Sequence, residues 1–114
     1  MPRFNPVSLT SRTRPAKDTA FPFHFTTSGK LNLPSNVNAA DGCKGGAVTV
    51  QFRAGKKTIS SRRVGLKKDC TFRSAVTFKI PARLHPKSLT VIVRFLGNGT
   101  MNPKSAKRRK VGVA

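Results

Sequence analysis

The sequence predicts an all-β protein in which six or seven short antiparallel strands form a sandwich or a small barrel. Apolar and polar residues alternate over most of the chain, which is typical of strands with one buried face. No window of useful length has its apolar residues at helical spacing. Turn residues separate the alternating segments at short intervals. Because no crossover helices are predicted, we expect antiparallel pairing.

The first twenty residues carry basic side chains among Pro, Ser and Thr and have little apolar pattern. We therefore expect residues 1–20 to be a disordered basic tail and residues 21–114 to form the domain. The first expected strand covers 21–25, where Phe21, Phe23 and Phe25 alternate with Pro22 and His24. Proline cannot donate a ladder hydrogen bond, so this segment is expected at a sheet edge or at a strand entrance.

A hairpin is predicted within residues 46–66, with a short turn at 54–56. Its first arm alternates cleanly through Val48, Val50 and Phe52. In the returning arm Ile59 and Val64 are five positions apart, so they share a face only if the strand is bulged. We therefore expect this arm to be bent or at an edge.

The strongest strand signal covers residues 70–80, where every second residue except Ser74 is apolar and Pro81 follows. A turn is expected at His85-Pro86-Lys87. Residues 89–96 are apolar on both faces near their end, which predicts a central strand. Gly97-Asn98-Gly99 interrupts the chain before a last arm over 105–113.

Cys43 and Cys70 are the two cysteines of the chain. A structural zinc site needs four ligands at short spacings, and the sequence has no such cluster and no CxxC motif. A disulfide is favoured, and two buried reduced thiols are the alternative. A disulfide would close a loop of about 28 residues and stabilise the fold by roughly 3–4 kcal/mol. It would also indicate an oxidising compartment.

Five segments together resemble an immunoglobulin-like β-sandwich module of secreted or surface-anchored bacterial proteins. They read FHFTTSGKL (23–31), GCKGGAVTV (42–50), AGKKTISSRRVGL (54–66), DCTFRS (69–74) and VRFLGN (93–98). The resemblance covers about residues 21–113. It implies pairing of Cys43 with Cys70 and a structural role as stalk, spacer or adhesive domain. The chain lacks the core Trp and corner Tyr of antibody-type domains, which favours the looser bacterial kind.

The charge balance is extreme, with 23 Lys and Arg against three Asp and no Glu, a formal net charge of +20. Such a charge attracts polyanions such as nucleic acid, anionic lipid surfaces or acidic polysaccharides. It also keeps a protein soluble without any dedicated partner. The basic residues that we expect to contact a polyanion are Arg53, Lys56, Lys57, Arg62, Arg63, Lys67, Lys68, Lys107, Arg108, Arg109 and Lys110. The last four fit a solvated basic edge strand about as well as a binding site; they also match a nuclear localisation signal, which conflicts with a disulfide.

An enzyme is not indicated. His24 and His85 are the two histidines, and both are expected at the surface without a nucleophile and an orienting acid beside them. The glycine-rich GCKGG segment (42–46) lacks the spacing of a phosphate-binding loop and is better explained as a turn beside a disulfide. Asn98-Gly99-Thr100 matches the short N-glycosylation pattern. We predict no cofactor, no metal site and no transmembrane segment.

The function expected from these observations is a non-enzymatic extracellular or cell-surface module that adheres to polyanions electrostatically. The location is inferred from the cysteine pair, since residues 1–20 contain no signal-peptide pattern. The alternative is an intracellular nucleic-acid-binding protein of the ribosomal or chromatin-associated type, which free thiols would favour. Self-assembly through an edge strand or the tail is a further expectation.

Overall fold

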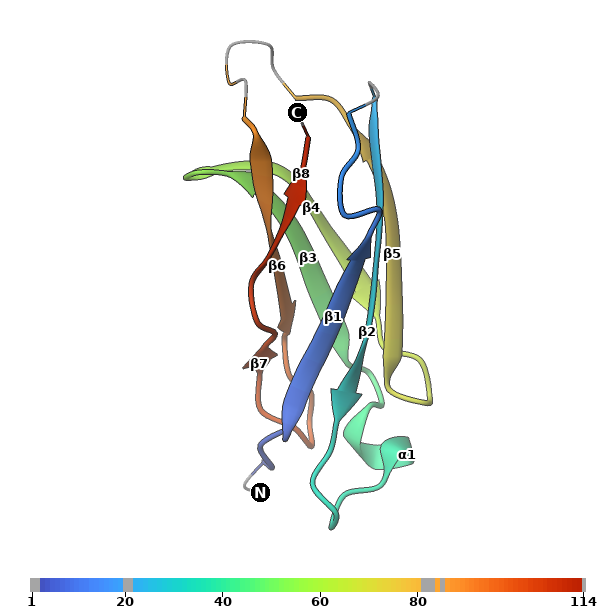
Figure 1. Cartoon of the computed structure of the whole chain (residues 1–114). Helices are drawn as coiled ribbons and strands as arrows, with labels where there is room; N and C mark the ends of the chain where they lie inside the picture. The colour runs from blue at the N-terminus through green and yellow to red at the C-terminus, as the bar shows by residue number, and fades with distance from the viewer. Residues whose placement is uncertain (1–2, 20–21, 81–83, 85, 114) are drawn as a thin grey trace.

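Two antiparallel β-sheets pack face to face in the computed structural model of the chain (Figure 1). The structure describes residues 3–19, 22–80, 84 and 86–113. The smaller sheet has three strands in the order β1 (Ser8–Arg14), β2 (Phe23–Asn32) and β5 (Thr71–Phe78). A four-residue helix, α1 (Ala39–Gly42), lies between β2 and the second sheet in the sequence.

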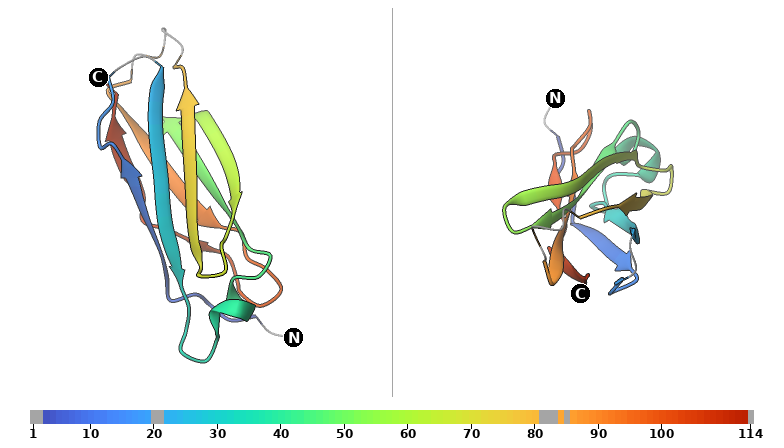
Figure 2. Two further views of the ribbon diagram at one scale, coloured as in Figure 1. Left: turned by 90° about the vertical axis from the view of Figure 1, so that its right-hand side faces the viewer. Right: turned by 90° about the horizontal axis from the view of Figure 1, so that it is seen from above.

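The larger sheet has the order β4-β3-β6-β7, with β8 also paired to β6. Its strands are β3 (Ala47–Ala54), β4 (Lys57–Gly65), β6 (Ser88–Phe95), β7 (Lys104–Ser105) and β8 (Arg109–Gly112). Figure 2 shows the two layers from the side and from above. The predicted all-β class and antiparallel pairing are therefore confirmed, and the two sheets fit a sandwich.

The prediction of a disordered tail is wrong for Ser8–Arg14, because this segment forms β1. It pairs with β2 over its whole length, from Ser8 opposite Asn32 to Arg14 opposite Thr26. Leu9 and Ser11 face the core and are buried, while Arg12 and Arg14 are exposed. Alternation is therefore present, but one large apolar residue and small hydroxyl residues carry too weak a hydrophobic signal to reveal it.

The position of β2 also differs from the prediction. Since β1 and β5 pair with its two sides, β2 is the central strand of its sheet, and the edge placement is wrong. The strand begins at Phe23, immediately after Pro22, so a strand entrance is the correct interpretation of that proline. Phe21 itself lies outside the described residues, as do Pro81 and His85.

The predicted hairpin is confirmed as β3 and β4, joined at Gly55 with φ +61°. The register shifts between Phe52, opposite Ser60, and Arg53, opposite Thr58, so Ile59 is the extra residue of a bulge. β4 is also the edge strand of its sheet. Both features that the spacing of Ile59 and Val64 predicted are therefore present.

The two strongest strand predictions correspond to β5 and β6. Phe72, Ser74, Val76 and Phe78 of β5 are buried, as the alternation predicted. β6 lies between β3 and the pair β7 and β8, so its central position is confirmed. The predicted last arm is divided into β7 and β8, and eight strands are present within the described residues instead of six or seven.

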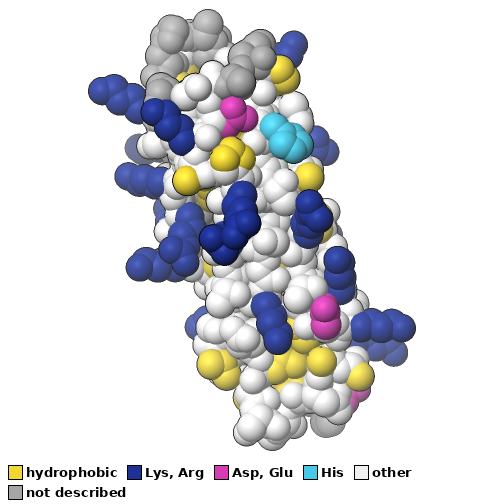
Figure 3. All heavy atoms as spheres, turned by 45° about the vertical axis from the view of Figure 1, so that its right-hand side comes forward, with side chains coloured by type: hydrophobic (Ala, Val, Ile, Leu, Met, Phe, Trp, Pro, Cys, Tyr) yellow, Lys and Arg dark blue, Asp and Glu magenta, His cyan; other side chains and the backbone are white. Residues whose placement is uncertain are grey.

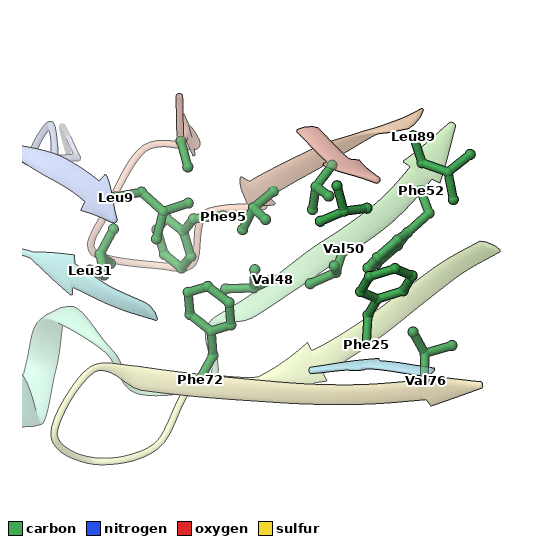
Figure 4. Close-up of a cluster of buried hydrophobic side chains, with 14 of the residues drawn as sticks. Leu9, Phe25, Leu31, Val48, Val50, Phe52, Phe72, Val76, Leu89 and Phe95 are labelled. Carbon is green, nitrogen blue, oxygen red and sulfur yellow. The ribbon is translucent and has the colours of Figure 1, made fainter. Parts of the chain in front are cut away.

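The core between the sheets has two parts (Figure 4). Toward one end, Phe25 and Phe52 pack with tilted rings near Val76 and Leu89, and Phe78 packs 5.2 Å from Phe52 between ring centroids. Toward the other end, Phe72 and Phe95 pack with neighbours that include Leu9, Leu31 and Val48. Alternating apolar residues of both sheets fill this layer, which removes their side chains from water.

The predicted disulfide between Cys43 and Cys70 is present, with 5.4 Å between the two Cα atoms. Cys43 follows α1 and precedes β3, whereas Cys70 directly precedes β5, so the bond joins the two sheets at one end of the sandwich. Within the GCKGG segment Gly42 ends α1, and the predicted turn is present at Lys44-Gly45, beside this disulfide. Cys70 adopts a left-handed backbone conformation, with φ 69°.

Candidate functional site

The basic residues predicted from the sequence do not form one surface. Arg53, Arg63 and Lys110 occupy outward positions of the larger sheet, where Arg53 and Lys110 both pair with Thr90. The remaining members lie in or beside turns and edges: Lys56 and Lys57 at the hairpin, Arg62 on β4, Lys67 and Lys68 before β5, Lys107 and Arg108 before β8, and Arg109 on β8. The set is therefore spread around the molecule.

Arg53 differs from the other predicted residues because its side chain has a structural contact. Its Nη2 donates a 2.9 Å hydrogen bond to the carbonyl oxygen of Lys56. This bond links β3 to the turn of the β3–β4 hairpin. Its Nε is buried and has no hydrogen-bond partner within the described residues. Arg53 is therefore less available to an external ligand than the exposed arginines around it.

The outer surface of the smaller sheet carries a basic cluster that sequence analysis missed. We define the β1–β2–β5 face by its outward side chains: Thr10, Arg12, Arg14, His24, Thr26, Ser28, Lys30, Thr71, Arg73, Ala75 and Thr77. Four of them are arginine or lysine, one is histidine and five carry hydroxyl groups. Figure 3 views the molecule from this side and shows Lys and Arg side chains along its length.

The strand register brings two of these arginines into one row across the sheet. Arg12 pairs with Ser28, and Ser28 pairs on its other side with Arg73. Neighbouring strands are about 4.8 Å apart, so the Cα atoms of Arg12 and Arg73 are separated by roughly 10 Å. Lys30 lies two residues further along β2, in the next row between Thr10 and Thr71.

Two grooves, of about 450 and 540 Å³, lie on the β1–β2–β5 face and share Arg12, Ser28 and Arg73 as lining residues. The first continues toward Lys30 and Lys67. The second continues toward Arg14, His24 and Thr26. The grooves therefore meet at the arginine row and follow the direction of β2, where the small side chain of Ser28 lies between the longer ones of Arg12 and Arg73.

The outer surface of the larger sheet carries a second row of the same kind. We define the β4–β3–β6 face by Thr49, Gln51, Arg53, Ser61, Arg63, Thr90, Ile92 and Arg94. Arg63 and Arg94 flank Thr49, as Arg12 and Arg73 flank Ser28 on the other sheet. Both pairs are exposed. Cations thus cover both outer surfaces of the sandwich.

Two of the three carboxylates, those of Asp18 and Asp69, accept hydrogen bonds from nearby groups. Oδ2 of Asp18 accepts a 2.9 Å hydrogen bond from the backbone N–H of His24. Oδ1 of Asp69 accepts from the side chain and the backbone N–H of Thr71, at 2.5 and 3.1 Å. These two hydrogen bonds, the side-chain bond first, lower the pKa of Asp69 below its ordinary value. With three negative side chains in all, most of the positive charge is available to an external anion.

A third pocket, of about 510 Å³, lies beside the disulfide. Its lining includes Ala39, Ala40, Cys43 and Leu66, with Lys44 and Lys68 as the charged residues. Lys68 therefore faces a mainly apolar pocket, whereas its neighbour Lys67 borders a groove of the β1–β2–β5 face. The two neighbouring lysines between β4 and β5 therefore belong to different surfaces, Lys67 to the β1–β2–β5 face and Lys68 to the pocket beside the disulfide.

The two histidines are the candidate general bases of the chain. His24 is exposed on the open β1–β2–β5 face, and its Nδ1 lies 2.7 Å from Oγ1 of Thr77. His85 lies outside the described residues. Within residues 3–19, 22–80, 84 and 86–113, no three His, Cys, Asp or Glu side chains gather in a way that could hold a metal ion. The expectations that the chain is not an enzyme and binds no cofactor stay predictions.

The side-chain amide of Asn98, the residue that matches the glycosylation pattern, makes hydrogen bonds within the structure. Nδ2 of Asn98 donates to the carbonyl oxygens of Gly42 and Lys44, at 2.8 and 3.1 Å. Its Oδ1 accepts from the backbone N–H groups of Thr100 and Met101, at 2.9 and 2.7 Å. A glycan on Nδ2 would replace one of its two hydrogens and so remove at least one of the first two bonds, and the side chain is better explained as a structural link.

Within the described parts of the chain, no helix has the length and apolar character needed to cross a membrane. Comparison with known proteins adds no assignment to these surfaces: no protein-family model matches the sequence, and no curated protein matches it significantly.

Proposed function

We propose that the protein is a non-enzymatic extracellular or cell-surface module, immunoglobulin-like in fold, that adheres to polyanions through electrostatic attraction. The observation that carries this proposal is the arrangement of charge. A net charge of +20 is distributed over the outer surfaces of both sheets, with exposed arginine pairs on each. A surface of this kind concentrates anionic polymers around it over a distance set by salt.

The immunoglobulin-like part of the proposal is supported by topology. Three strands face a sheet in which β4, β3 and β6 are neighbours, and successive strands are joined by hairpins or by crossings between the sheets. Immunoglobulin-type sandwiches combine two antiparallel sheets in a related way. Such folds present two broad sheet faces and loops at both ends, which suits an adhesive or spacer role.

The extracellular location is supported by the disulfide. Disulfides persist in oxidising compartments, and a chain with this charge benefits from a covalent link between its sheets. The alternative function, an intracellular nucleic-acid-binding protein, draws on the same charge. It gains no support from the six phenylalanines of the strands, Phe23, Phe25, Phe52, Phe72, Phe78 and Phe95, because they are buried and therefore unable to stack on bases.

Binding to immobilised heparin, with neutral dextran as the matched control, tests the polyanion proposal. We expect retention on heparin alone, with an affinity that falls steeply between about 50 and 200 mM salt, as counterion release requires. Equal retention on dextran, or no retention on heparin at low salt, would contradict the proposal.

Intact mass measured with and without alkylation tests the location. Protein from its native source is expected to be two hydrogens lighter than the reduced chain and to resist alkylation under non-reducing conditions. Two alkylated thiols would instead support the intracellular nucleic-acid alternative.

A further inference from the structure

We propose that the β1–β2–β5 face binds a linear polysaccharide that carries carboxylate or sulfate groups, and that the polysaccharide lies along β2 between Arg12 and Arg73. This inference rests on the proposed polyanion adhesion and adds to it a defined surface and a class of ligand.

The shape of the face is the first argument. The two grooves meet at the row formed by Arg12, Ser28 and Arg73 and extend from there in opposite directions along β2. Small residues line the middle of this path: Thr26, Ser28 and Gly29. The longer side chains of Arg12 and Arg73 border it from the two edge strands. A shallow path of this kind fits an extended chain better than a compact ligand.

The chemistry of the lining is the second argument. A guanidinium group presents a planar fork of donors that matches the two oxygens of a carboxylate or sulfate. Arg12, Arg14 and Arg73 present three such forks, and Lys30 and Lys67 add two point charges at one end. Thr10, Thr26, Ser28 and Thr71 supply hydroxyl groups, which donate and accept and so match the hydroxyl groups of a sugar. Charge and hydroxyl complementarity therefore occur on the same surface.

The same lining disfavours nucleic acid as the specific ligand. Reading a duplex requires an element that enters a groove, and binding single strands relies on aromatic stacking platforms. The phenylalanines of β2 and β5 point inward and are buried. A flat sheet face without an outward Phe can attract phosphates but offers no surface on which bases stack.

The β4–β3–β6 face provides an internal contrast. It has the same arginine spacing, with Arg63 and Arg94 on either side of Thr49. However, the next row along the strands places Ile92 beside Gln51, and Arg53 is engaged by the Lys56 carbonyl oxygen. We therefore infer that this face contributes to general attraction and that the β1–β2–β5 face holds the polysaccharide.

Two double variants with equal charge test this inference. R12S/R73S and R63S/R94S each remove two exposed arginines from one row, so their net charges are identical and their positions differ. Titration calorimetry of the full chain would use heparin as the sulfated probe, polygalacturonate as the uronate probe and a duplex DNA, all at one salt concentration. Thermal melts would establish that both variants are folded.

We expect R12S/R73S to weaken binding to at least one of the two polysaccharides by about tenfold or more, as expected for the loss of two charge-assisted contacts. R63S/R94S is expected to weaken it by about threefold or less, through general attraction alone. A third variant, R12K/R73K, keeps the charge and loses the fork, so we expect an intermediate loss.

Equal losses in the two serine variants would overturn the inference and leave polyanion adhesion intact, since net charge alone would then set the affinity. Full retention of affinity by R12K/R73K would overturn the role assigned to the guanidinium forks. Duplex DNA that binds more tightly than both polysaccharides and responds more strongly to R12S/R73S would overturn the choice of ligand. Failure of the wild-type protein to bind any of the three probes would instead overturn the proposed function itself.

Discussion

The two ends of the sandwich are held together by different interactions. At the aromatic end, defined by Phe23, Phe25, Phe52 and Phe78, ring packing joins the sheets, because Phe52 of the larger sheet lies 5.5 Å from Phe25 and 5.2 Å from Phe78 between ring centroids. At the disulfide end, defined by Cys43, Cys70 and Asn98, a covalent bond joins the sheets, and the Asn98 side chain links the loop after β6 to the segment that precedes β3. The difference shows that one small domain can combine non-directional burial with a few directional links.

The largest expected effect comes from opening the aromatic end. Phe52 is 1 % exposed and its ring contacts Phe25 and Phe78 across the sheets, so Phe52→Ala leaves a cavity between them. We expect the free energy of unfolding to fall by about 3–5 kcal/mol in urea unfolding. Phe4→Ala is the matched control, because Phe4 is 42 % exposed. A loss as large in Phe4→Ala would show that the aromatic end is not special.

Removing the covalent link should have the next largest effect. In the double variant C43S/C70S the unfolded chain regains the freedom that the closed loop restricts. We expect a loss of about 3–4 kcal/mol in the free energy of unfolding, and the reduced wild-type protein should unfold at a similar urea concentration. A double variant as stable as the oxidised wild type would mean that hydrogen bonds alone hold the disulfide end.

Asn98→Ala measures how much the side-chain hydrogen bonds of the disulfide end contribute to stability beside the disulfide itself. The substitution leaves two carbonyl oxygens and two N–H groups without their side-chain partner, in a part-buried loop. We expect a loss of about 1–3 kcal/mol by thermal or urea unfolding. Asn36→Ala serves as control, since Asn36 is exposed in a turn. Equal stability of the two variants would assign Asn98 no structural role.

The smallest effect concerns pH. Hydrogen bonds from Thr71 lower the pKa of Asp69 in the folded protein below the ordinary value of 3.8. The stabilisation is therefore fully present above pH 3.8 and is lost as the pH falls through the lower folded pKa. Asp69→Asn should flatten this acid part of the profile of melting temperature against pH. An unchanged acid profile in the variant would contradict the role of Asp69.

The aromatic end could be predicted from the sequence more fully than the disulfide end. Large apolar residues at every second position predict both a strand and which of its faces is buried. The sequence therefore predicts β3, β5 and β6 together with the residues that pack between the sheets. The cysteine pairing was also predicted. The bonds of Asn98 were not, because they join segments more than 50 residues apart through loop conformations that leave no periodic signal.

The candidate site was predicted in composition but not in place. The charge and the number of basic residues were evident, whereas the row of Arg12 and Arg73 depends on the register of β1 and β5 with β2. Since β1 was mistaken for a disordered tail, Arg12 and Arg14 were assigned to no surface. The alternation of Thr10, Arg12 and Arg14 with Ser11 and Thr13 was the available signal, and it was weak because both sets are polar.

The arrangement of the two outermost parts of the chain has a mechanical consequence. Phe4 bonds to the loop around Thr100 and Asn102, whereas Val113 bonds to Lys87 close to the start of β6, and the two segments lie at opposite ends of a body 49 Å long (Figure 1). Residues 16–18 also exchange hydrogen bonds with Gly112, where the two segments run parallel. A pull between Phe4 and Val113 would act along the strands and load these bonds in shear, together rather than one after another. Resistance to such a pull is governed by the unfolding rate. The lifetime of the domain under force would therefore depend on its unfolding rate more than on its equilibrium free energy of unfolding.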